Sequence, residues 1–143
     1  MKIINTNLKD ILVSIGMLII SATAYYVIDQ SQWLADIILS ITNQNLVLWP
    51  TLYFGTFALL VAVIILILSN LFNTNILISV LIVGLGGMAW HISDYNYSNI
   101  STYVGILGNG FYLLGAIFAL LIKIKSNKQF NPDSGADAPP PVN

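Results

Sequence analysis

The residues of this sequence best suited to acid–base or metal chemistry are a histidine and an aspartate that follows it. His91 is the only histidine in the chain. Asp94 comes three residues later, a spacing that puts both side chains on one face of a helix. A carboxylate in that position can orient an imidazole for proton transfer or for an axial bond to a metal. His91 is therefore the candidate cofactor-binding residue, as one ligand of a haem or metal that another chain completes.

A structural role for His91 is the alternative that we favour, in which the imidazole forms hydrogen bonds near its helix end and helps to hold two helices together. A single histidine cannot build a structural zinc site, and the chain has no Cys and no Glu to complete one. The sequence also lacks an ordered Ser-His-Asp set, a phosphate-binding glycine loop and paired carboxylates. We therefore predict that the protein is not an enzyme and holds no metal or cofactor.

The placement of the charged residues fixes the class of protein. Charged residues make up 8% of the chain and hydrophobic residues 57%, so whole segments carry no charge at all. The uncharged segments lie between Asp10 and Asp29, between Asp36 and Asp94, and between Asp94 and Lys123. A soluble domain would scatter charges over every exposed face, whereas these segments are long enough to cross a bilayer. The sequence predicts an all-α, polytopic integral membrane protein.

The hydrophobic segments divide the chain into three parts. Residues 1–10 form a cytoplasmic N-terminal segment, 11–125 a four-helix transmembrane domain, and 126–143 a disordered, proline-containing tail. The four spans are expected at about 11–28, 47–70, 76–93 and 102–122 and should form a small bundle. Asp10 is expected to cap the first span.

A secretory signal peptide is a competing interpretation of the first span. Two lysines precede an apolar run, and small residues at 21–24 would supply the cleavage site. We favour a retained helix because the apolar character continues through Tyr25 to Ile28.

A short amphipathic helix is expected at 33–42, between the first two spans. It is too short to cross a membrane, and Trp33 suits the headgroup depth of a helix lying on the membrane surface. The expected apolar face consists of Trp33, Leu34, Ile37, Ile38 and Ile41, and the polar face includes Asp36 and Ser40. An ordered loop packed on the bundle is the alternative.

The lysines predict the orientation of the chain in the membrane. The lysines precede the first span and follow the fourth. The only charged residues of the loops on the opposite side are aspartates. The positive-inside rule therefore puts both termini in the cytoplasm. A net charge of −1 gives no reason to expect nucleic acid as a partner.

Small residues predict close packing between the third and fourth spans. Gly84 and Gly87 share one helix face with His91 and Asp94. The facing residues of the fourth span are Gly105, Gly108, Tyr112, Gly115 and Ala119. Small residues let membrane helices approach closely, and the short connecting loop makes these two helices antiparallel neighbours.

Two polar residues in or beside the spans complete the candidate residues. Asp94 ends the third span, and Asn109 lies in the fourth. A polar side chain such as Asn109 commonly forms a hydrogen bond to a neighbouring helix. A path for a substrate or ion is the alternative.

The leading functional hypothesis is an accessory or structural subunit of a larger membrane assembly, either a membrane enzyme complex or a viral membrane. Its partners would be the lipid bilayer and other membrane subunits or further copies of itself. A second hypothesis is a small homo-oligomeric pore or holin-like protein, with Ser14, Ser21 and Tyr25 as the polar stripe. A third is a redox subunit that binds haem or quinone near His91, Tyr95 and Tyr112.

Overall fold

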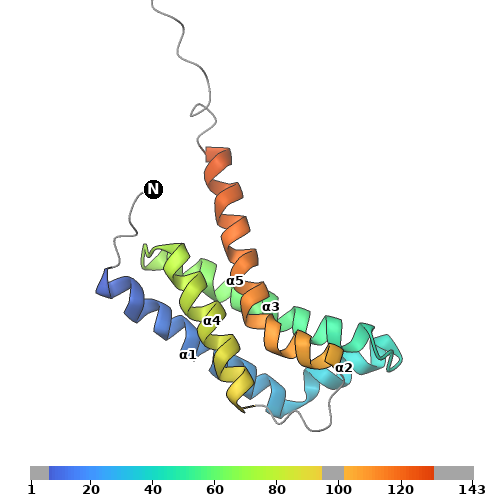
Figure 1. The fold of residues 1–143 in the computed structure, drawn as a ribbon. Helices are drawn as coiled ribbons and strands as arrows, with labels where there is room; N and C mark the ends of the chain where they lie inside the picture. The colour runs from blue at the N-terminus through green and yellow to red at the C-terminus, as the bar shows by residue number, and fades with distance from the viewer. Residues whose placement is uncertain (1–6, 95–101, 131–143) are drawn as a thin grey trace, which may run out of the picture.

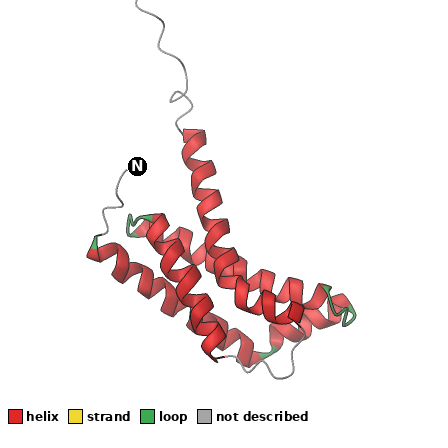
Figure 2. Cartoon of the chain, viewed as in Figure 1, coloured by secondary structure: helices red, strands yellow, loops and turns green. Residues whose placement is uncertain are grey.

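The computed structural model describes residues 7–94 and 102–130, and these residues form five helices (Figure 1). The helices are α1 (Leu8–Ser31), α2 (Trp33–Thr42), α3 (Leu48–Leu71), α4 (Ile76–Asp94) and α5 (Thr102–Phe130). Helices and short turns account for all the described residues, which contain no strand (Figure 2). The predicted all-α class is confirmed.

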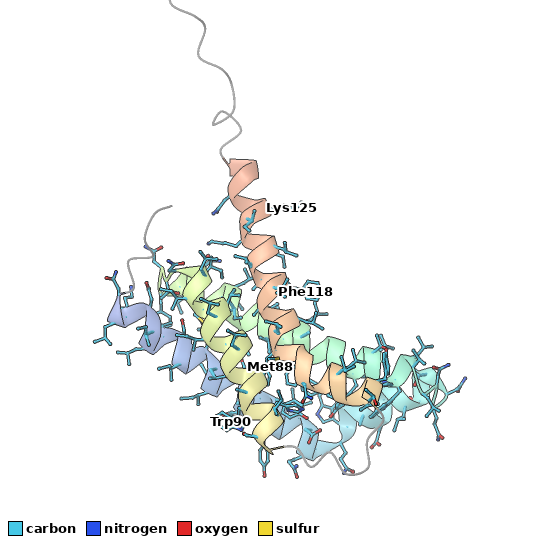
Figure 3. All side chains as sticks on the ribbon, in the orientation of Figure 1. Met88, Trp90, Phe118 and Lys125 are labelled. Atoms are coloured by element: carbon cyan, nitrogen blue, oxygen red, sulfur yellow. The ribbon has the colours of Figure 1, made fainter. Side chains whose placement is uncertain are left out.

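Four of the helices, α1, α3, α4 and α5, are long and apolar enough to cross a membrane. Their number and order match the four predicted spans. Helix α5 continues to Phe130, past the expected end of the span at 122 and into the segment 126–143 that we expected to be disordered. Figure 3 places Lys125 on this last part of α5, which projects beyond the other helices. Residues 1–6 and 131–143 lie outside the described residues.

The start of α1 differs from the expectation. The helix begins at Leu8 with Asn7 as its N-cap residue, so Asp10 lies in the first turn and does not cap it. Asp10 instead is buried, and its Oδ1 accepts a hydrogen bond of 3.4 Å from the backbone N–H of Asn75, just before α4. The carboxylate therefore ties α1 to the start of α4.

Polar contacts show which helix ends lie together. Lys123 of α5 donates a hydrogen bond to Asn70 near the end of α3, at the same end of the bundle as Asp10 and Asn75. At the opposite end, Thr51 of α3 and Tyr103 of α5 share a hydrogen bond of 2.5 Å. Successive long helices therefore run in alternating directions, as four consecutive membrane spans must.

Helix α5 is the centre of the packing. It lies against both α3 and α4, while α1 packs mainly on α4 and less on α3, and α2 packs on the first half of α3. The core consists of aromatic, aliphatic and alanine side chains, among them Met17, Tyr53, Phe54, Phe57, Val61, Ile65, Val83, Phe111, Tyr112 and Ala116.

The two faces of α1 have the polarity expected in lipid. Its buried residues are Asp10, Ser14, Met17 and Ser21, whereas its exposed residues include Leu12, Ile15, Ile19 and Ile20. A helix of a soluble protein would place these faces the other way round. The outward apolar face therefore fits a surface in contact with hydrocarbon.

The apolar side chains of α2 point in two directions, some toward the bundle and others toward the outside. Ile38 is buried against the bundle and Leu34 is partly buried, but Trp33, Ile37 and Ile41 are exposed. The single apolar face expected for 33–42 is thus split into a side that packs on the protein and an exposed stripe, because α2 lies beside α3.

Candidate functional site

His91 lies inside a cluster of aromatic rings contributed by three other helices. It is buried, and its ring meets those of Tyr25 of α1 and Phe111 of α5 edge to face, each with the ring centroids 5.4 Å apart. Tyr25 also packs edge to face on Phe57 of α3, at 4.8 Å. Helix α4 therefore presents its histidine to α1 and α5 together, at the point where all four long helices meet.

One nitrogen of His91 lies within the contact between α4 and α5. A methyl group added at Gly108 would lie 3.3 Å from His91 Nε2 and 3.2 Å from Cζ of Phe54. Nε2 therefore lies on the side of the His91 ring that faces Gly108 of α5. Among the described residues, no group of three His, Cys, Asp or Glu side chains could hold a metal ion.

A cavity of about 380 Å³ opens beside His91. Its lining is mostly aromatic and consists of Ile19, Ala22, Thr23, Tyr25, Tyr26, Trp90, His91 and Tyr112. Tyr26 and Trp90 are exposed on the outer surface of the bundle, and Figure 3 shows Trp90 near the end of α4, beside α1. The cavity has the size of a small-ligand site and offers flat rings together with the polar groups of His91, Thr23 and the tyrosines.

Gly84 and Gly87 of α4, which were predicted to pack on the fourth span, face α5. The ring of Tyr112 occupies the place where a side chain at Gly87 would lie, with ring atom Cε1 2.9 Å from the ideal Cβ position. At Gly84 the corresponding distance to Cβ of Ala116 is 3.1 Å. Neither position has room for a larger residue without a shift of its neighbours.

Gly115 faces a different helix from the one expected. An added Cβ there would meet the backbone oxygen of Ala58 and lie 2.8 Å from Cβ of Val61, both on α3. The reason is that α5 lies between α3 and α4, so its small residues are shared between two contacts. Ala119 is fully buried, and Gly105 is partly buried near the start of α5.

The remaining candidate residues are not all brought together. Asn109 is partly buried on α5. Asp94 is the last residue of α4, but its side chain and all of Tyr95 lie outside the part of the chain whose positions are described. The proposed pairing of His91 with Asp94 therefore stays a prediction.

The polar stripe suggested for a pore lies inside the molecule. Ser14 is fully buried; its Oγ donates a 2.6 Å hydrogen bond to the carbonyl of Asp10 and lies 3.0 Å from Oγ of Ser79 on α4. Ser21 is buried as well, and Tyr25 lies in the aromatic cluster. These side chains face the other helices of the same chain.

The sequence linked Tyr112 to His91, but the other rings around His91 were not predicted. Tyr25 was named only for the length of the first span and for the pore stripe, and Phe54, Phe57 and Phe111 were not singled out. Phe57 and Phe111 come from different helices, so the sequence contains no local spacing that links either to His91. One signal in the sequence could have indicated the aromatic cluster: aromatic residues are concentrated at one end of each span.

No protein family model, curated protein or solved structure matches this chain. The assignment that the fold supports is thus the general class: four long apolar helices in a small bundle, as in multi-pass helical membrane proteins.

Proposed function

We propose that this protein is a non-catalytic subunit of a larger membrane assembly. The observation that carries the proposal is the environment of its glycines. Gly84, Gly87, Gly108 and Gly115 are surrounded by side chains of other helices. Gly16, Gly55 and Gly110 instead have open space where a side chain would be.

Within the part of the chain described, the glycines that face open space do not allow any other helix to approach closely. Glycine inside a helix costs up to about 1 kcal/mol relative to alanine in water-soluble hosts. Small residues on a membrane helix allow the backbone of a second helix to approach, and the resulting van der Waals contacts stabilise helix association in lipid. We infer that one or more of Gly16, Gly55 and Gly110 lie under a helix of another polypeptide.

The proposed orientation keeps both termini in the cytoplasm. Lys9, Lys123 and Lys125 lie on the helix segments near one end of the bundle, and Asp29 and Asp36 lie near the other. This distribution supports the orientation through the positive-inside rule. The exposed stripe of Trp33, Ile37 and Ile41 supports a position of α2 at the outer membrane surface.

The test is the mass of the native assembly, measured after extraction from the membrane in a mild amphiphile. We expect a complex with other polypeptides. Gly55→Leu, Gly16→Leu and Gly110→Leu should be compared with Val63→Leu, which changes an exposed α3 residue that is not glycine. At least one glycine variant should release the partner while the control keeps it. A monomer in native membranes would overturn the proposal.

A lipophilic ring-containing ligand at His91 is the second candidate function. The aromatic cavity beside His91 supports it, and the cavity volume of about 380 Å³ favours a quinone-like ring over a haem. Organic extraction of the purified protein, followed by an absorption spectrum of the extract, tests this function. Ala22→Phe should fill the cavity and abolish the extracted compound, whereas Ala24→Phe, outside the lining, should not.

The pore hypothesis would need another polar stripe, because Ser14 and Ser21 are buried within one chain. Leakage from liposomes that contain only the purified protein would support the pore hypothesis again. A homo-oligomer that leaks would replace the subunit proposal.

A further inference from the structure

A second cavity, of about 380 Å³, lies where the end of α1 meets α2 and the start of α3. Its walls include the carboxylates of Asp29 and Asp36 and the rings of Tyr25, Trp49 and Tyr53. We call this cavity the acidic cup. Apart from Tyr25, it shares no lining residue with the cavity beside His91. It is therefore a separate candidate site.

The aromatic wall of the acidic cup is ordered by specific contacts. The rings of Trp49 and Tyr53 are stacked, with centroids 5.5 Å apart and an angle of 10° between their planes. The Tyr53 hydroxyl donates a 2.7 Å hydrogen bond to Oδ1 of Asp29, which fixes this carboxylate beside the rings. The indole N–H of Trp49 is buried and has no hydrogen-bond acceptor among the described residues.

Among the residues whose positions are described, no basic side chain lines the cup to balance its negative charge. No lysine or arginine occurs between Lys9 and Lys123. Lys9 lies at the start of α1, and Lys123 binds Asn70 at the opposite end of the bundle. Asp36 is exposed and Asp29 partly buried, so both carboxylates can meet a ligand from outside.

We propose that the acidic cup binds an alkylammonium group. A carboxylate attracts the charge of an ammonium, and aromatic faces stabilise a desolvated organic cation through their quadrupoles. Rings supply none of the oxygen ligands that a small inorganic cation needs, so the aromatic part of the wall favours an organic cation. The ammonium can belong to a soluble amine or to the headgroup of a lipid, since both present the same chemistry.

The experiment is equilibrium binding of radiolabelled choline to the full-length protein in nanodiscs of phosphatidylglycerol, a lipid without an ammonium group. We expect saturable binding. Asp36→Asn should weaken it about tenfold, and Asp29→Asn by at least as much. Because Asp36 is exposed, its substitution should leave the fold intact, which unfolding temperatures will verify.

Matched variants distinguish choline binding in the acidic cup from a general effect of negative charge on binding. Asp94→Asn removes the same charge from the end of α4 and should leave binding unchanged. Trp49→Leu should weaken binding, whereas Trp33→Leu, which changes an exposed tryptophan outside the lining, should not. Potassium chloride at equal concentration should not displace choline.

The lipid composition distinguishes the two sources of the ammonium. If phosphatidylcholine nanodiscs weaken choline binding through competition, the cup takes a lipid headgroup. If binding is equal in both lipids, it takes a soluble amine. The proposal is overturned if choline does not bind saturably in phosphatidylglycerol, if potassium displaces it, or if Asp94→Asn weakens binding as much as Asp36→Asn.

Discussion

The ring of Tyr112 on α5 lies in the space that any side chain at Gly87 on α4 would occupy. Both residues are buried, and Tyr112 stacks on Phe111 with the ring centroids 4.2 Å apart. The glycine thus lets an aromatic residue lie directly on the backbone of the neighbouring helix. This contact joins the packing of α4 and α5 to the aromatic cluster around His91.

The first prediction compares two identical changes at glycines with opposite surroundings. Gly87→Ala should destabilise the protein by about 1–3 kcal/mol, because the added methyl group overlaps the Tyr112 ring. Gly55→Ala, which enters open space, should be neutral or stabilising by up to about 1 kcal/mol. Unfolding in detergent, followed by circular dichroism, measures both. Equal effects would contradict the packing described here.

The second prediction tests the position of Gly108 between α3 and α4. Gly108→Leu should force Phe54 and His91 away from α5 and lower the unfolding temperature by more than Gly87→Ala does. Gly110→Leu, measured like the other variants on the purified chain without partner polypeptides, is the control, because its added side chain meets open space within this chain. A Gly108→Leu protein as stable as the parent would contradict the close approach of Gly108 to Phe54 and His91.

The third prediction concerns the buried hydrogen bond between Ser14 and Ser79. A double-mutant cycle with Ser14→Ala and Ser79→Ala should give a coupling free energy of about 1 kcal/mol or less, as is usual between membrane helices. Ser14 keeps its bond to the Asp10 carbonyl when Ser79 is changed, which limits the loss. Strict additivity of the two substitutions would argue against direct contact.

The fourth prediction tests the orientation in the membrane. The chain has no cysteine, so a single introduced thiol can be labelled without ambiguity. Ser40→Cys on α2 should react with an impermeant reagent on intact cells, and Ser126→Cys on α5 only after lysis. Both serines are exposed. The opposite pattern would reverse the orientation that the lysines predict.

The fifth prediction concerns the depth of α2. With Trp49→Phe and Trp90→Phe, Trp33 becomes the only tryptophan, and it lies on the exposed stripe of α2. Lipids brominated near the headgroup should quench its fluorescence more than lipids brominated near the chain ends. Stronger quenching from the chain ends would place α2 deep in the bilayer.

The sequence alone determined the elements of this fold. Long uncharged apolar segments are unfavourable in water, and hydrocarbon requires backbone groups to be paired within the protein, which a helix achieves within its own segment. Four apolar helices and the short helix α2 therefore follow from composition and length. The glycines of α4 and α5 also predicted close packing, because spacing on a helix places them on one face.

Only the tertiary structure decided which faces meet. In lipid, an apolar pattern does not distinguish inside from outside, so the sequence did not place α5 between α3 and α4 or turn Gly115 toward α3. The aromatic cluster around His91 and the acidic cup each combine residues from several helices, and their spacing along the chain carries no information about these contacts. Asp10 illustrates the same limit: its sequence position suggested a cap, and its partner, Asn75, comes from another helix boundary.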